Sequence, residues 1–133
     1  MKSDIDIKDD LFQFIKKSPL ALAVTGKTCK TGVRPKDSDK EDVVISVIAN
    51  LNGQIQEAVV NVNIYVADDI KSDGQSQEAT IRLRELCKVA SETLEVGHGE
   101  TYRFTLESQR VLAVDDAKVH VINNRLIYKQ LNE

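Results

Sequence analysis

The sequence has 133 residues, of which 41% are hydrophobic and 29% are charged, and its net charge is −3. This length fits one domain, residues 1–133, that buries roughly two-thirds of the surface of the unfolded chain. The negative charge argues against nucleic acid as the primary partner, because such proteins neutralise phosphates with Lys and Arg. No apolar run approaches the ~18 residues of a membrane span, so we expect no membrane partner.

The start of the chain and its cysteines indicate a cellular compartment. Met1 to Asp6 lacks the apolar run of a signal peptide. Cys29 and Cys87 are too few and too far apart for a disulfide framework. We therefore expect reduced cysteines and an intracellular protein.

The N-terminal part predicts two short helices and a loop. Residues 6–17 have apolar side chains at i, i+4, i+7 and i+8, with aspartates early and lysines late. Those apolar residues are Ile7, Leu11, Phe14 and Ile15. Ser18-Pro19 ends this helix and suits the start of a second short helical turn over 20–24. Residues 27–42 predict a long polar loop, with a short strand over 28–31.

Residues 43–50 and 54–68 predict a long β-hairpin. Asn52-Gly53 favours a two-residue type I′ turn, which requires positive φ at both positions. That turn sets a register with one wholly apolar face, and a slip of one residue would destroy the sorting. The pairs predicted on the apolar face are Val43–Val62, Ile45–Val60 and Val47–Ala58. The pairs predicted on the other face are Val44–Asn61, Ser46–Val59 and Ile48–Glu57.

The second face of this hairpin is too apolar for an ordinary solvent-exposed face and too polar for a face buried in a core. Val44, Ile48, Val59 and Tyr65 share it. It is compatible with a subunit interface, or with cover by the protein's own N-terminal helix or C-terminal strands. The hairpin edges also need protection or a pairing partner.

The C-terminal half predicts a helix and further strands. After a polar loop over 68–75, a helix runs through Val96 with one apolar stripe. The stripe consists of Ala79, Leu83, Leu86, Cys87, Ala90 and Leu94. Gly97 suits the position after the helix, and 97–99 then form a turn.

In the last segments, apolar and polar residues alternate, as they do in half-buried strands. Residues 101–106 predict a half-buried strand, which a bulge over 108–110 interrupts before 111–114 resume it. Asn123-Asn124 could form a hairpin turn, but we prefer one last strand over 122–131, because residues 115–117 already supply the reversal. This order of elements indicates an α+β fold: an antiparallel or mixed sheet with a long hairpin, packed against two main helices.

Two partial motifs lack residues that their chemistry needs. Gly26-Lys27-Thr28 resembles the end of a phosphate-binding loop, but Ala21 occupies the position of an essential glycine. Asp37, Asp39 and Glu41 alternate as calcium ligands do. Asp42 and Ile48 then stand where that motif needs Gly and Glu. We therefore expect no cofactor and no metal.

No catalytic constellation is evident. His98 and His120 have no partner at a diagnostic spacing. Cys87 lies on the apolar stripe of its helix, and Cys29 stands between lysines without other support for a nucleophile. Asp115-Asp116 indicates a turn, because adjacent strand residues point to opposite faces. We predict that the protein is not an enzyme, and an enzyme using Cys29 or His98 is our third hypothesis.

The order and texture of these segments resemble the small tail-completion or tail-terminator proteins of long-tailed bacteriophages and prophages, the group that includes the minor tail protein U type. The resemblance covers nearly the whole chain. It rests on the N-terminal helix, Ser18-Pro19-Leu20 to Gly26, Arg34-Pro35, Asp42-Val43-Val44-Ile45, the strand 60–66, the helix 79–94, and Asn124-Arg125-Leu126-Ile127-Tyr128.

The resemblance implies a structural protein that assembles as a ring, commonly a hexamer, in the host cytoplasm and then joins the virion. The ring caps the tail tube and presents a surface to the head-side connector, and the family assigns no catalytic residue. An alternative is a monomeric module that binds another protein through the hairpin edge. The candidate interface residues are Val44, Ile48, Val59, Tyr65, Arg34, Lys36 and Lys40.

Overall fold

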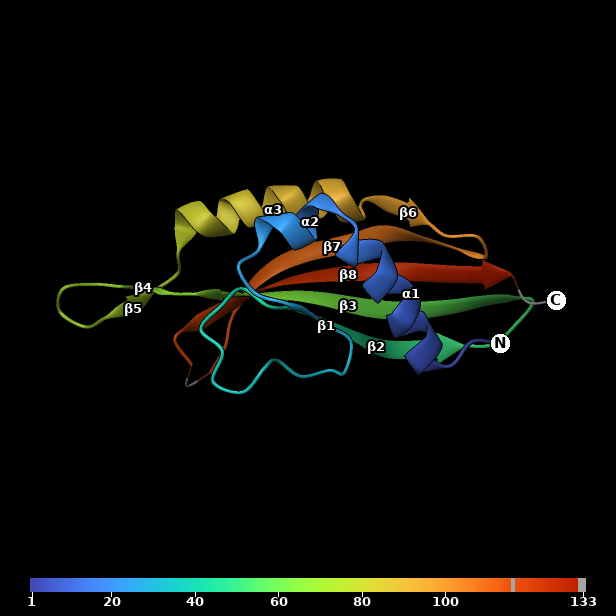
Figure 1. The fold of residues 1–133 in the computed structure, drawn as a ribbon, viewed down its shortest axis with the longest axis horizontal. Coiled ribbons are helices and arrows are strands. Elements are labelled where there is room, and N and C mark those ends of the chain that lie inside the picture. Colours follow the sequence, from blue (N-terminus) through green and yellow to red (C-terminus); the bar gives the residue numbers. More distant parts are fainter. Residues whose placement is uncertain (116, 132–133) are drawn as a thin grey trace.

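The computed structural model describes residues 1–115 and 117–131, and it confirms the α+β fold class. These residues form a curled mixed sheet with the strand order β1-β2-β3-β8-β7-β6 and a separate two-stranded hairpin, β4-β5. Three helices pack against one face of the main sheet, and the small hairpin projects from one end (Figure 1). The start of α1 and the end of β8 lie at the opposite end.

The helices occur close to the predicted positions. They are α1 (Asp4–Lys16), α2 (Pro19–Ala23) and α3 (Thr80–Leu94). Ser3 caps α1 because its hydroxyl accepts a hydrogen bond from the Asp6 amide, while the Asp6 carboxylate accepts one from the Ser3 amide. Proline at the first position of α2 has the φ angle that a helix start requires.

The strands confirm a single last strand rather than a turn at Asn123-Asn124. The strands are β1 (Thr28–Cys29), β2 (Val43–Leu51), β3 (Ile55–Ala67), β4 (Asp69–Ile70), β5 (Ser76–Gln77), β6 (Val96–His98), β7 (Tyr102–Ala113) and β8 (Val119–Leu131). A bulge is present in β7, but its extra residue is Glu107, between Leu106 and Ser108, one position before the predicted segment 108–110. The predicted reversal over 115–117 includes Asp116, which lies outside the described residues.

The β2–β3 hairpin exists, but its predicted turn and register are wrong. Val43 lies opposite Ile64 rather than Val62, and Leu51 lies opposite Glu57. Positive φ angles occur at Gly32, Asp37 and Gly74 among the described residues, and not in the turn, so the turn is not type I′. A bulge at Ile48 then shifts the register once more. Up to Val47 the shift of two residues preserves which face each side chain occupies, so that part of the hairpin keeps its apolar face. Beyond the bulge the faces change, and Ala49, opposite Val59, lies on the other face.

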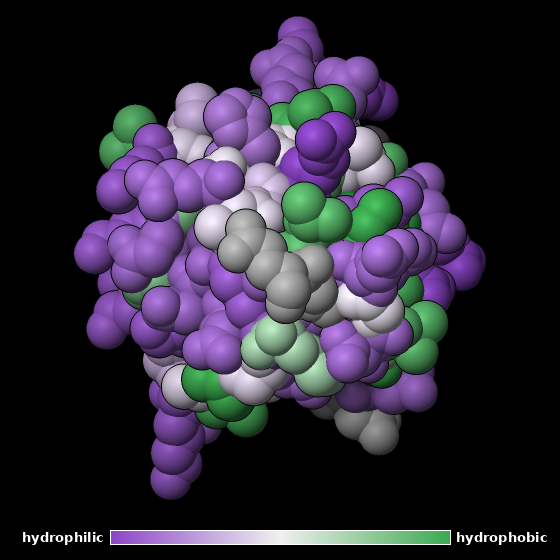
Figure 2. Space-filling model, turned by 90° about the vertical axis from the view of Figure 1, so that its right-hand side faces the viewer, coloured by the Kyte–Doolittle hydropathy of each residue, from purple (hydrophilic) through white to green (hydrophobic). Residues whose placement is uncertain are grey.

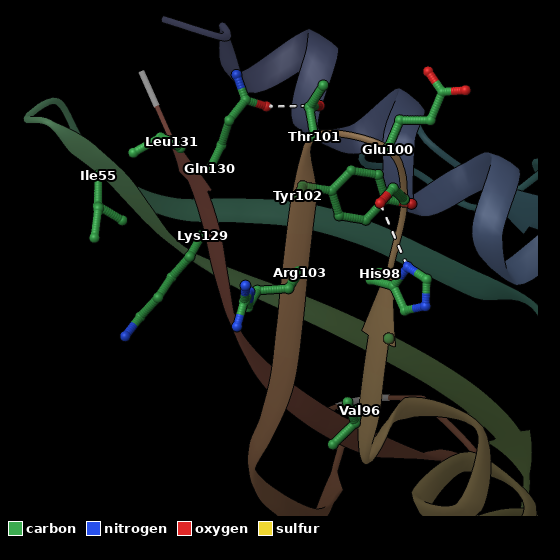
Figure 3. Close-up of a pocket in the computed structure, with 12 residues that line it drawn as sticks. Ile55, Val96, His98, Glu100, Thr101, Tyr102, Arg103, Lys129, Gln130 and Leu131 are labelled. Carbon is green, nitrogen blue, oxygen red and sulfur yellow. Dashed lines mark hydrogen bonds between the residues drawn. The ribbon is translucent and has the colours of Figure 1, made fainter. Parts of the chain in front are cut away.

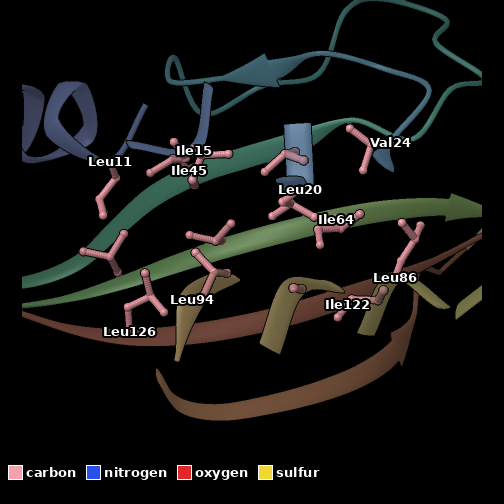
Figure 4. Packing of buried hydrophobic residues seen from close by; sticks show 14 of the residues in the cluster. Leu11, Ile15, Leu20, Val24, Ile45, Ile64, Leu86, Leu94, Ile122 and Leu126 are labelled. Atoms are coloured by element: carbon pink, nitrogen blue, oxygen red, sulfur yellow. The ribbon is translucent and has the colours of Figure 1, made fainter. Parts of the chain in front are cut away.

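The core lies between the helices and one face of the sheet. The even-numbered residues of β3 from Ala58 to Val66 are buried there, as are the even-numbered residues of β8 from Ile122 to Tyr128. Figure 4 shows Leu11, Ile15 and Leu20 from α1 and α2 directed toward Ile45 and Ile64. Leu86 and Leu94 contribute from α3, and burying such side chains stabilises the fold by about 1.5–3 kcal/mol each.

The predicted turn at 97–99 is wrong in part, because Gly97 lies inside β6 and pairs with Phe104. The reason is a close contact. A β-carbon at position 97 would lie 2.2 Å from the Phe104 ring and 2.9 Å from the Phe14 ring. These rings meet edge to face with centroids 4.9 Å apart. The glycine therefore makes room for an aromatic pair rather than ending a helix.

Replacing this glycine tests the packing around the two rings. Gly97→Ala should lower the free energy of unfolding by about 1–3 kcal/mol, because the added methyl group overpacks the aromatic pair. Urea denaturation measures this change. The matched control is Gly53→Ala, where the nearest atom is a backbone oxygen at 3.4 Å. Equal stability of the two variants would contradict the packing argument.

Candidate interaction surface

None of the described helices packs against the second face of the main sheet, and we call it the open face. The odd-numbered residues of β3 and β8 point to it. Strand pairing places one row of small and apolar side chains across five strands: Ala49, Val59, Ile127, Thr105 and Val96. Val59 and Ile127 are half-buried in this row, and Val96 is 67% exposed.

One end of the open face is covered by the chain's own loop. The Arg34 guanidinium stacks over the Tyr65 ring at 4.5 Å from its centroid. Its Nε donates to Asp42 and its Nη2 donates to the Lys40 carbonyl at 2.8 Å. Val44 is only 5% exposed. Arg34 therefore fixes the loop that was predicted to be polar and exposed, while Lys36 and Lys40 stay on its outer side.

Asp42 is the buried junction of this loop. Its carboxylate accepts hydrogen bonds from the Lys27 amide (3.0 Å), Arg34 Nε (3.1 Å) and Ser38 Oγ (2.6 Å). Burial acts to raise the pKa of Asp42, but these hydrogen bonds outweigh it and hold the pKa below its usual value. Gly26 lies so close that a β-carbon there would be 2.3 Å from the carboxylate.

Glu41 connects the same segment to the helix layer. Arg82 of α3 donates to both carboxylate oxygens of Glu41, at 2.7 and 2.6 Å, and also to the Ala23 carbonyl at 2.6 Å. The paired carboxylate raises the pKa of the Arg82 guanidinium. This two-pronged geometry is the strong form of an Arg–carboxylate contact. It fixes α2, α3 and the start of β2 relative to one another.

The other end of the open face contains a hollow of about 810 Å³, lined by residues of β3, β6, β7 and β8 (Figure 3). Ile55, Val96 and Leu131 expose between 57% and 67% of their surface there. Arg103 and Lys129 are direct neighbours across β7 and β8. Among the described residues, no carboxylate lies within ion-pair distance of either. Like charges placed directly opposite destabilise a sheet unless an anion neutralises them.

Figure 2 views the molecule from this end. Hydrophobic residues appear there as several small patches between hydrophilic side chains. Leu51, which is 67% exposed, lies opposite Glu57 at the end of β2.

A projecting hairpin, which we call the arm, lies at the far end and spans residues 68–78. Asp68 fixes its base: its carboxylate binds His120 Nδ1 at 2.6 Å and accepts a hydrogen bond from Ser76 Oγ at 2.6 Å. The Asp68 amide donates to the Lys118 carbonyl. These contacts outweigh burial and lower the pKa of Asp68. Beyond this base, the arm carries one exposed apolar residue, Ile70.

The structure separates the residues that the sequence singled out. Ile48 is exposed at a bulge and Val59 is half-buried on the open face, whereas Val44 and Tyr65 lie at its covered end. His98 is exposed, with Nδ1 3.4 Å from the Gly99 carbonyl. The contact between Asp68 and His120 joins residues 52 positions apart, so no local motif could indicate it.

Both cysteine thiols have a raised pKa. Burial is the main cause that raises the pKa of the Cys29 thiol, and nearby Asp42 adds to it. Burial likewise raises the pKa of Cys87. A reactive thiol needs a lowered pKa. Within the part of the chain that the structure describes, no group of three His, Cys, Asp or Glu residues could hold a metal ion.

Comparison with known proteins gives a fold relationship. The chain is similar to a chain in the solved structure "Virion of native gene transfer agent (GTA) particle", with a TM-score of 0.54 and 11% identity over 95% of both chains. No protein-family model matches the sequence. No curated protein matches it either. Among the described helices, none is long and apolar enough to cross a membrane.

The buried Asp42 carboxylate predicts a specific acid dependence. Its folded pKa lies below the ordinary value of 3.8, so its contribution to stability is complete above that pH and is lost as the pH falls through the folded pKa. Asp42→Asn should cost about 1–3 kcal/mol near neutral pH. This difference from the wild-type chain should shrink as the pH falls from about 5 to about 2.

Urea denaturation across that pH range measures the difference. Asp39→Asn is the control, because Asp39 is an exposed residue of the same loop. A deficit of Asp42→Asn that stays constant down to the lowest pH would contradict the role of the ionised carboxylate.

Proposed function

We propose that this chain is a structural protein of a phage-like virion, of the tail-terminator type, which acts by self-assembly into a ring, possibly a hexamer. The ring would cap the tail tube and join it to the head-side connector. The observation that carries this proposal is the match of nearly the whole fold to a chain of a virion particle, together with a sheet face that none of the described helices covers.

The open face supports a function in which copies of the chain contact one another, rather than a catalytic function. Side chains such as Leu51, Ile55 and Leu131 each leave more than half of their surface exposed at one end of the sheet. Single exposed apolar residues carry no meaning, but several on one face are typical of an interface. Lys36 and Lys40, on the outer side of the 27–42 loop, would contact a tail-tube or connector protein.

The bulges favour the face over the edges as the contact. The alternative function, a monomeric module that pairs through its hairpin edge, needs a regular unpaired edge. On β2, which β1 covers only at Val43 and Val44, the free edge contains the bulge at Ile48. On β7 the free edge begins with the bulge at Glu107. Bulges at exposed edges hinder pairing with another strand.

The mechanism of a tail terminator is geometric. One face of the ring would match the last layer of the tube, and the other face would not repeat that layer, so polymerisation would stop. The exposed residues of this chain would supply both sets of contacts, and no covalent step is required. Such a protein would assemble in the host cytoplasm and remain in the virion.

Removal of the gene from the phage or prophage that encodes the chain tests this function. We expect tails of irregular length that do not attach to heads, because nothing would end tube growth. Electron microscopy of the particles measures both properties, and expression of the chain in trans should restore them. Tails of normal length on intact particles would contradict the tail-terminator function.

Val59→Lys tests whether the open face is shared between subunits. A charged side chain at this half-buried position should weaken self-association about tenfold or more, by burying an unpaired charge in the contact. The free energy of unfolding should change by less than about 1 kcal/mol, because a lysine on an open face can extend to water. Sedimentation velocity and urea denaturation measure the two effects.

Val33→Lys makes the same chemical change at an exposed loop position and serves as the control. A large loss of stability in Val59→Lys without an effect on association would instead mean that Val59 supports the monomer.

A further inference from the structure

The arm and the hollow have opposite charges. The arm beyond Asp68 contains three carboxylates and one lysine, a net charge of −2. These are Asp69, Asp73, Glu78 and Lys71. The hollow is lined by two cations and one carboxylate, a net charge of +1, in a chain whose net charge is −3. These are Arg103, Lys129 and Glu100.

Both surfaces also expose apolar side chains. Ile70 on the arm is 52% exposed. Its strand pairs with β5, through Asp69–Gln77 and Ile70–Ser76. In the hollow, Ile55, Val96 and Leu131 are exposed to a similar or greater degree. Ile70 of the arm, which has carboxylates beside it, is therefore complementary to the apolar residues of the hollow, which have Arg103 and Lys129 beside them.

The arm has a defined direction. Asp68 joins three segments, because its carboxylate binds both Ser76 of the arm and His120 of β8, and its amide binds the Lys118 carbonyl. The Asp68 side chain is only 6% exposed. A buried, fully paired carboxylate restricts the base of the arm, which lowers the entropic cost of presenting it to a partner.

We propose that the arm of one copy binds the hollow of a second copy. Ile70 would contact the apolar residues of the hollow, and Asp69 and Asp73 would neutralise Arg103 and Lys129. The arm and the hollow lie at opposite ends of the longest axis (Figure 1). The contact is therefore head-to-tail, and such contacts form a closed ring when their rotation closes. This inference rests on the proposed self-assembly and assigns its contact.

Charge reversal on each side tests the pairing. Asp69→Lys with Asp73→Lys alters only the arm, and Arg103→Glu with Lys129→Glu alters only the hollow. Sedimentation velocity over a concentration series should show each double variant associating at least about tenfold more weakly than the wild-type chain. Ile70→Asp should have a similar effect without touching the sheet. Circular dichroism and urea denaturation establish that each variant is folded.

An equimolar mixture of the two charge-reversed variants gives the sharpest result. Each reversed arm then meets a reversed hollow, and each unaltered arm meets an unaltered hollow, so the mixture should associate like the wild-type chain. Glu92→Lys with Glu95→Lys, which changes the net charge as the arm variant does at exposed positions of the α3 end, should leave association unchanged.

The outcomes separate this proposal from the proposed function. If the wild-type chain associates and the arm variants associate equally well, the arm contact is wrong and ring assembly stands. If the separate variants are defective but their mixture does not recover, the direct pairing is wrong. A wild-type chain that stays monomeric at the highest concentration measured overturns both the contact and the self-assembly on which it rests.

Discussion

The pairing of β3 with β8 forms the centre of the main sheet, and the other elements are arranged around it. Thirteen residues of each strand pair without a register shift, from Ile55 with Leu131 to Ala67 with Val119. At about 3.4 Å per residue, this ladder extends over roughly 40 Å. Its ends determine where the two exposed features lie. The hollow begins where β3 begins, and the arm begins where β3 ends.

The helices cover only one side of this ladder, and that asymmetry produces the open face. On the covered side, the sheet and helices bury a continuous apolar core, and Arg82 and Glu41 lock the helix layer to the start of β2. On the other side, the 27–42 loop covers only one end of the sheet. The contacts of Arg34 with Asp42 and Tyr65 hold this loop in place. The remaining end keeps its apolar and cationic side chains exposed, and the proposed contact between copies is placed there.

The elements with a strong local pattern could be predicted from the sequence. The spacing of Ile7, Leu11 and Ile15 indicated α1, and alternation indicated the strands and the bulge in β7. The hairpin register could not be predicted, because pairing Val43 with Val62 or with Ile64 places the same side chains on each face. Packing between β2, β3 and β8 chooses between these registers, and it overrides the turn preference of Asn52-Gly53.

The candidate site was harder to predict than the fold. Ile48 and Val59 could be placed on one hairpin face, but which parts of that face stay open depends on the path of the 27–42 loop. In the local sequence, Gly97 is typical of a turn. The close contact with the Phe104 ring, which explains this glycine, depends on the tertiary structure and cannot be predicted from local sequence. The contact between Asp68 and His120 fixes the base of the arm, and only the tertiary structure brings these two residues together.

Electron cryomicroscopy of the assembled particle tests the central claim most directly, namely that the open face is a contact between copies of this chain. We expect a ring of this protein between the tail tube and the head-side connector, in which residues 69–73 of each copy cover Arg103 and Lys129 of the next. A particle in which these two side chains face solvent, or in which the chain occurs as single isolated copies, would contradict it.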